Sequence, residues 1–147
     1  MTTVEVTIAA PRADVWEALV DVRTYPSWLI GARRIRAVDE HWPAPGSAFH
    51  HVVGAGPVRI ADRTRSVAVD PPSRFELDVR AWPALRATVV FELRDAVEGT
   101  HVSMEEHPMG PHRVLAPVLA PLTQLRNRAS LAQLENRVRQ RMGGRPG

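Results

Sequence analysis

The 147-residue sequence contains neither cysteine nor lysine. Without cysteine, the chain cannot form a disulfide, a thiolate nucleophile, or a zinc or iron–sulfur site with cysteine ligands. Without lysine, it cannot form a side-chain Schiff base, which excludes pyridoxal-phosphate enzymes and lysine-dependent aldolases. Arginine supplies all 19 basic side chains. The use of arginine in place of lysine throughout is typical of a GC-rich genome rather than of a particular function.

Long apolar runs are also missing. No stretch approaches the ~20 apolar residues that a membrane span needs. The most apolar segment, 114–122, is short and is interrupted by Pro117 and Pro121. The first residues, Met1-Thr2-Thr3, enter a strand pattern without the basic region and apolar core of a secretory signal. These observations predict a cytoplasmic protein without integral membrane association.

The excess of positive charge is small, because 19 basic residues are balanced by 16 acidic ones, a formal net charge of +3. The arginines are scattered among the acidic residues and match no recognised DNA-binding motif. We therefore expect no nucleic-acid partner. The apolar content of 44% is that of an ordinary globular protein.

The apolar residues recur along the chain with a spacing that changes from that of a strand to that of a helix and back. A strand pattern over 3–9 runs into a helical pattern opened by Pro11. A second short helix at 27–30 is followed by period-two segments, which predict strands at 33–41, 47–53, 58–69, 74–81, 85–94 and 100–107. Helical periodicity then extends from about Val114 to Met142. We expect a single domain over 1–142 and a frayed tail at 143–147.

The predicted strands are apolar on one face and polar on the other, as in a sheet covered on one side only. The residues expected to cover that face from the last helix are Leu115, Leu119, Leu122, Leu131, Leu134 and Val138. The predicted fold is α+β, with about six or seven strands in a curved antiparallel sheet that wraps around a long C-terminal helix. One helix cannot close such a sheet completely, which predicts a cavity between them.

The order of several short motifs supports this fold. The motifs are Asp14-Val15-Trp16, Tyr25-Pro26-x-Trp28, Val69-Asp70-Pro71-Pro72 and Gly99-Thr100-x-Val102, between a first strand and a long terminal helix. In this order and spacing, the chain resembles the START/polyketide-cyclase/pollen-allergen superfamily (SRPBCC proteins) from about Val4 to Arg141. The resemblance implies a helix-grip fold with a hydrophobic ligand cavity.

Two polar residues with inward parity are candidate catalytic groups. Glu106 follows Val102 and Met104 at alternate positions, and His51 follows Phe49 in the same way. A carboxylate or an imidazole in an apolar cavity could move a proton or orient a ligand. The alternatives are a position at the water-filled cavity mouth or an internal Arg–Glu pair for Glu106, and an ordinary hydrogen bond for His51.

The predicted ligand-binding residues share the inward parity or flank the cavity entrance. Arg63 and Arg65 precede Val67 with the same parity, although they could instead meet water at the cavity mouth. Trp28 is expected to cap the entrance, with ordinary core packing as the alternative. The full set is Trp28, Phe49, His51, Arg65, Val67, Leu77, Val79, Val89, Phe91, Met104, Glu106 and Met109.

We expect neither a metal site nor a cofactor. His50 and His51 are adjacent in a strand and point to opposite faces, so they cannot ligate one ion together. His101, Glu105 and His107 share the outward face, which is a poor place for catalysis. No Gly-x-Ser-x-Gly elbow is present, so no serine triad is predicted.

Three functions remain open. The first is binding of a small hydrophobic or aromatic metabolite or lipid in an internal cavity, by a monomer or homodimer. The second is a polyketide cyclase/dehydrase-type enzyme, in which a polar cavity residue moves protons. The third is a protein-interaction module, suggested by the apolar segment 114–122. The sequence leaves open whether any reaction is catalysed.

Overall fold

The computed structural model of the chain describes residues 2–21, 32–55, 58–81, 85–110, 114 and 116–143. Within these ranges it describes the backbone, but not the side chains, of 32–36, 51–55, 58–62, 80–81, 85, 116 and 119. Several predictions lie outside what is described, among them the short helix at 27–30, the packing of Leu115 and Leu119, and most of the frayed tail.

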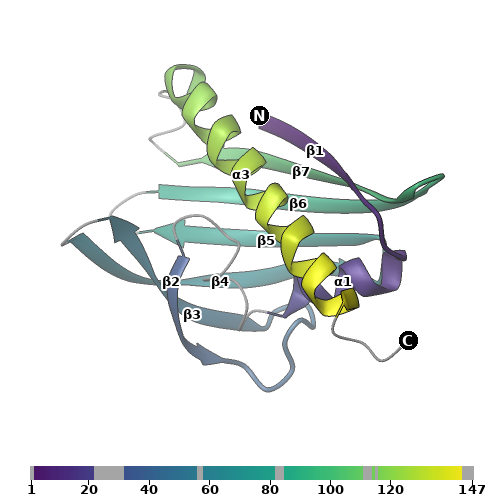
Figure 1. Cartoon of the computed structure of the whole chain (residues 1–147). Helices are drawn as coiled ribbons and strands as arrows, with labels where there is room; N and C mark the ends of the chain where they lie inside the picture. The colour runs from purple at the N-terminus through teal and green to yellow at the C-terminus, as the bar shows by residue number, and fades with distance from the viewer. Residues whose placement is uncertain are drawn as a thin grey trace.

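A long helix crosses a seven-stranded antiparallel sheet, which confirms the predicted α+β helix-grip fold (Figure 1). The strand order is β1-β7-β6-β5-β4-β3-β2, so the first strand closes one edge beside the last. The elements are β1 (Thr2–Ile8), α1 (Arg12–Val20), β2 (Ala32–Val38), β3 (Ala48–Ala55), β4 (Val58–Asp70), β5 (Arg74–Ala81), β6 (Leu85–Ala96), β7 (Gly99–Met109) and α3 (Ala116–Gly143).

The Gly99-Thr100 motif joins the turn after β1 to the start of β7. Gly99 has φ +143, and a Cβ there would lie 2.8 Å from the backbone nitrogen of Ala10. Only glycine combines this conformation with so close an approach. The Thr100 hydroxyl donates a hydrogen bond of 2.8 Å to the carbonyl oxygen of Ala10. The motif therefore positions α1 against the sheet.

Helix α1 packs on the inner face of the sheet through aromatic side chains. Trp16 lies 5.7 Å from Phe75, measured between ring centroids. Trp42, from the loop after β2, meets Phe49 edge-on at 4.9 Å, and its indole N–H donates to the carbonyl oxygen of Val20. Side chains thus fill the space between α1 and the sheet.

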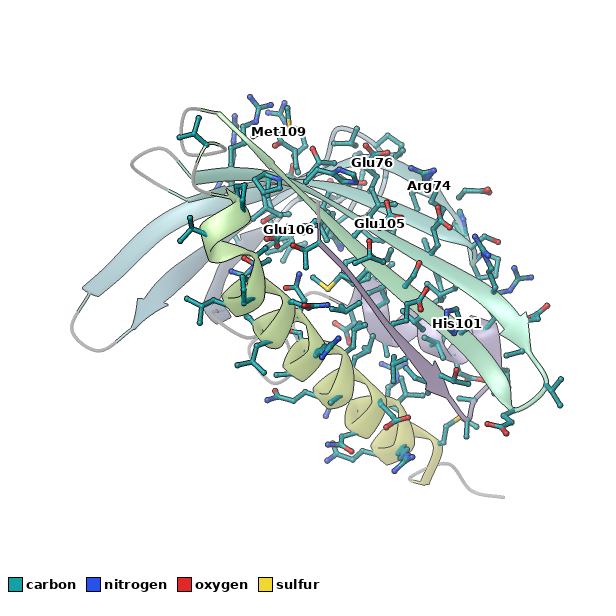
Figure 2. The ribbon with its side chains drawn as sticks, turned by 90° about the horizontal axis from the view of Figure 1, so that it is seen from above. Arg74, Glu76, His101, Glu105, Glu106 and Met109 are labelled. Carbon is teal, nitrogen blue, oxygen red and sulfur yellow. The ribbon has the colours of Figure 1, made fainter. Side chains whose placement is uncertain are left out.

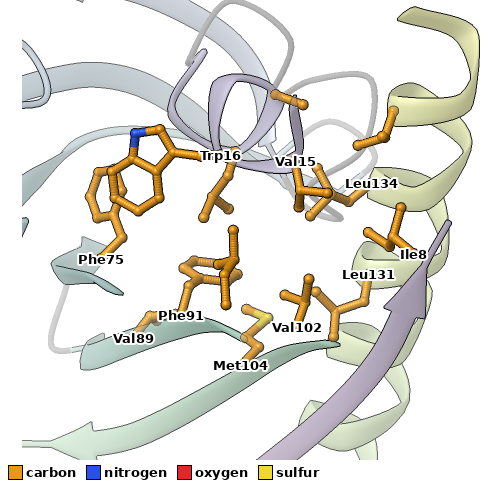
Figure 3. Packing of buried hydrophobic residues seen from close by; sticks show 14 of the residues in the cluster. Ile8, Val15, Trp16, Phe75, Val89, Phe91, Val102, Met104, Leu131 and Leu134 are labelled. Atoms are coloured by element: carbon orange, nitrogen blue, oxygen red, sulfur yellow. The ribbon is translucent and has the colours of Figure 1, made fainter. Parts of the chain in front are cut away.

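The second half of α3 completes this core. Leu131, Leu134 and Val138 are almost fully buried, as predicted. They pack with residues of β1, α1 and β7, including Ile8 and Val102 (Figure 3). At the end of the helix, Arg141 pairs with Glu17 and Asp21, at 3.4 and 3.7 Å. These ion pairs hold the last turn of α3 to α1.

The first half of α3 differs from the prediction. Leu122 was expected to cover the sheet, but it is exposed. It lies nine residues before Leu131, and at about 100° per residue this separation places the two on opposite sides of the helix. The helix also continues through Pro121. Among the described residues, no helix is both long and apolar enough to cross a membrane.

A β-bulge in β4 overturns the predicted parity of this strand. Ser66 pairs with Leu77 and Ala68 with Glu76, which leaves Val67 as an extra residue with no partner across the ladder. The alternation therefore changes phase at Val67. Val69 packs against the core, but Arg65 faces solvent and Val67 is 46% exposed.

Candidate functional site

Six of the predicted ligand-binding residues share the inner face of the sheet. Five are buried in the hydrophobic core, and Val79 packs against them while half exposed. The five are Phe49, Leu77, Val89, Phe91 and Met104. Neighbouring strands align them in rows, because Leu77 pairs with Val89 and Phe91 pairs with Met104. Their role in ligand binding stays a prediction.

Three other predicted residues lie elsewhere. Thr64 and Ser66 occupy the inner positions of β4 that Arg65 and Val67 were expected to take, because of the bulge. Met109 is on the outer face, where its sulfur accepts a hydrogen bond of 3.2 Å from the Thr88 hydroxyl. It is therefore not part of the inner wall. Trp28 and the side chain of His51 are outside what the structure describes.

Glu106 is held by an arginine from α3. Arg126 Nη2 donates to Oε1 of Glu106 at 2.7 Å and to Oε2 at 3.0 Å. The Glu106 side chain is only 12% exposed, whereas that of Arg126 is 45% exposed. The pair bridges β7 and the first half of α3, near the start of β1 (Figure 2). The sequence left an internal Arg–Glu pair as an alternative; the pair exists, with a nearly buried carboxylate and an arginine that is almost half exposed.

Asn127 lies next to this pair and is 1% exposed. Its Oδ1 accepts a long hydrogen bond of 3.4 Å from Arg126 Nε. Its Nδ2 is buried and has no hydrogen-bond partner among the described residues. A buried donor without an acceptor is destabilising, so this amide is suited to an acceptor that the described residues do not provide.

Three described residues of α3 that precede Asn127 on the sheet side are small or polar. Ala120, Thr123 and Gln124 are half-buried, whereas Leu131 and Leu134 are almost fully buried. The helix therefore closes on the sheet tightly in its second half and loosely in its first. We call these regions the closed end and the open end. Glu106 and Asn127 mark the boundary between them.

Sequence reasoning missed Arg126, Asn127 and Trp42. A signal for Asn127 existed, because it stands four residues before Leu131 and seven before Leu134, on the same helical face. An amide on that face is the exception that a helical-wheel inspection would reveal. Trp42 was assigned to a proline-rich turn, and turns rarely contribute to a core.

The outer face carries two pairs of histidine and glutamate. His101 Nε2 lies 3.5 Å from a carboxylate oxygen of Glu5, and His107 Nε2 lies 3.4 Å from one of Glu105. The two pairs are separate. Within the described ranges, no group of three or more His, Asp or Glu side chains could hold a metal ion.

The sequence matches a known family over nearly its whole length. A family model described as polyketide cyclase / dehydrase and lipid transport matches residues 1–139. The chain belongs to this family. It is therefore a member of the START/polyketide-cyclase/pollen-allergen superfamily, as its motifs indicated. A search of curated proteins gave no match.

Solved structures share the fold over almost the whole chain. Protein NE0264 from Nitrosomonas europaea has a TM-score of 0.76 at 19% identity, covering 96% of this chain and 95% of that one. Ara h 8.0201 has a TM-score of 0.76 at 14% identity, covering 94% and 96%. The di-domain ARO/CYC StfQ from the steffimycin biosynthetic pathway has a TM-score of 0.75 at 13% identity, covering 96% and 51%. At these identities the likeness is one of fold alone.

Proposed function

We propose that this protein binds a small hydrophobic or aromatic molecule that carries at least one hydrogen-bond acceptor. The observation that carries the proposal is the buried Nδ2 of Asn127, which has no hydrogen-bond partner among the described residues and lies beside an apolar sheet face. The ligand lies between the first half of α3 and the sheet, with its acceptor on Asn127 Nδ2. Lipids and aromatic metabolites with a carbonyl or hydroxyl group both have this chemistry.

The apolar part of the ligand lies against the sheet at the open end. Leu77, Val79 and Val89 lie on adjacent strands there, and Val79 is half exposed. At the closed end, Trp16, Phe75 and the leucines of α3 already occupy the space. A pocket mainly apolar with a few polar groups is the usual form of a small-molecule site.

The position of Glu106 favours binding over catalysis. Both carboxylate oxygens accept hydrogen bonds from Arg126, so the carboxylate is already engaged within the protein rather than directed at a substrate. In our proposal, the Arg126–Glu106 pair keeps Arg126 in place beside the ligand acceptor. A cyclase/dehydrase role would instead require this pair to open during the reaction.

The test is native mass spectrometry of the freshly purified full chain, followed by identification of any molecule released on denaturation. Asn127→Leu is compared with Asn136→Leu, because Asn136 is exposed on the same helix. We expect a discrete extra mass on the wild type and on Asn136→Leu, and a much smaller bound fraction on Asn127→Leu. Stripped of ligand, Asn127→Leu should be more stable to urea than the wild type by about 1 kcal/mol, because an unpaired buried amide is removed.

Two results would contradict the proposal. One is a wild-type protein that releases no small molecule and fails to bind a fluorescent fatty acid or an aromatic naphthalene probe. The other is an Asn127→Leu variant that keeps its ligand but loses stability, since the amide would then have a structural partner. Loss of turnover in Glu106→Gln, with ligand binding intact, would favour the cyclase/dehydrase role instead.

A further inference from the structure

The first half of α3 has a second apolar side, which faces away from the sheet. Val118, Leu122 and Leu125 are 76%, 67% and 67% exposed, and Val114 just before the helix is 75% exposed. We call these four residues the outer stripe. Their spacing of four, four and three residues places those of α3 on one helical face. That face is opposite the one that carries Leu131.

The outer stripe lies in a region without negative charge. The sequence contains no Asp or Glu from 107 to 134, while it contains Arg113, Arg126 and Arg128. Over its whole length α3 has five arginines and one glutamate. The carboxylate nearest in the chain, Glu106, is held by Arg126. Arg128 is exposed at the margin of the stripe.

We propose that the outer stripe docks on the surface of an anionic lipid bilayer, with α3 lying in the interface. Exposed aliphatic side chains bordered by arginine, without acidic residues, are the composition of helices that lie on such membranes. The aliphatic side chains enter the boundary between headgroups and acyl chains, and Arg128 pairs with lipid phosphate. The negative headgroups supply the charge that the sequence lacks from 107 to 134.

Two other occupants fit the surface less well. A second copy of this chain, packed through the same stripe, would bring together two copies of a helical segment that carries arginine and no acidic residue from 116 to 134. A protein partner would be expected to meet the aromatic anchors that dominate the energy of protein interfaces. The outer stripe consists of valine and leucine alone.

The experiment is co-sedimentation of the full chain with vesicles of phosphatidylcholine alone or of equal parts phosphatidylcholine and phosphatidylglycerol. We expect binding to the mixed vesicles, weaker at high salt because the charge contribution is screened, and little binding to phosphatidylcholine alone. The double variant Leu122→Gln/Leu125→Gln should bind at least about tenfold more weakly. Arg128→Gln should lose part of the preference for phosphatidylglycerol.

The matched control is Val97→Gln, which removes an exposed valine from the turn between β6 and β7. It should bind vesicles like the wild type. Because Leu122 and Leu125 are exposed, the double variant should fold normally, and its thermal unfolding by circular dichroism checks this. Asn127→Leu should keep vesicle binding, so failure of ligand binding and failure of docking remain distinguishable.

Three results would overturn docking on a bilayer. The first is no co-sedimentation with the mixed vesicles. The second is equal binding by the wild type and the folded double variant. The third is a dimer in analytical ultracentrifugation that the double variant converts to monomer, since a second copy of this chain would then cover the stripe.

Discussion

Glu106 and Arg126 form one pair but have different surroundings. The carboxylate is nearly buried, while the guanidinium is almost half exposed. Removing either partner leaves the other without its counter-charge. The resulting loss of folding stability depends on whether the remaining charged group can be hydrated by water.

This difference predicts unequal effects of two substitutions. Glu106→Gln keeps an acceptor for Arg126, which can rehydrate, and should lower the free energy of unfolding by no more than about 1 kcal/mol. Arg126→Gln leaves a nearly buried carboxylate without its arginine and should cost about 2 kcal/mol. Urea denaturation at neutral pH measures both. Equal losses would mean that the carboxylate is hydrated in solution.

The inner positions of the candidate site could be predicted from the sequence wherever strands are regular. Alternation correctly placed Leu77, Phe91 and Met104, because each strand there is continuous. It failed for Arg65 and Val67, because the bulge changes the phase of β4 and no residue type in that strand marks it. A shift of one residue moves every side chain to the other face.

At the scale of elements, the two halves of α3 turn opposite kinds of side chain toward the sheet. Its second half buries leucine and valine against the sheet. Its first half turns Ala120, Thr123 and Gln124 toward the sheet and leucine toward solvent. Periodicity alone could not reveal this reversal, because apolar residues occur around the whole circumference of the first half. Packing of Leu131 and Leu134 at the closed end fixes the rotation of the helix about its axis, and this rotation determines which side of the first half faces the sheet.

The reversal predicts very different effects for the same substitution at two positions of α3. Leu131→Ala should lower the free energy of unfolding by about 2–5 kcal/mol, because it leaves a cavity in the core. Leu122→Ala should change it by less than about 0.5 kcal/mol, because the side chain is already exposed. Urea denaturation of the two variants gives both values. A large loss in Leu122→Ala would show that the stripe is covered in solution, as in a homodimer.

At the scale of the whole molecule, stability is distributed unevenly along the axis of α3. The closed end combines α1, the turn before β7 and the second half of α3. Among the described side chains of the first half of α3, few are buried at the open end. Local unfolding of the backbone is expected to cost the least free energy where buried apolar contacts are fewest.

Hydrogen exchange should therefore divide α3 into two parts. In the ligand-free protein, amides of 131–141 should exchange much more slowly than amides of 118–125, because the former open only with the core. Adding the ligand should slow exchange in 118–125 and leave 131–141 unchanged. Uniform protection along the helix would contradict the division into a closed and an open end.

The ion pairs of Arg141 have a mechanical consequence. They hold the C-terminal end of α3 to α1, and Leu131 and Leu134 hold its middle, whereas the described side chains before Asn127 are exposed or only half-buried. The part of α3 before Asn127 spans about 16 Å, and a tilt of ~10° would displace its tip by ~3 Å. A bilayer that bound the outer stripe would act at the end of α3 farthest from the Arg141 ion pairs. A given tilt of the helix moves that end farther from the sheet than any other part.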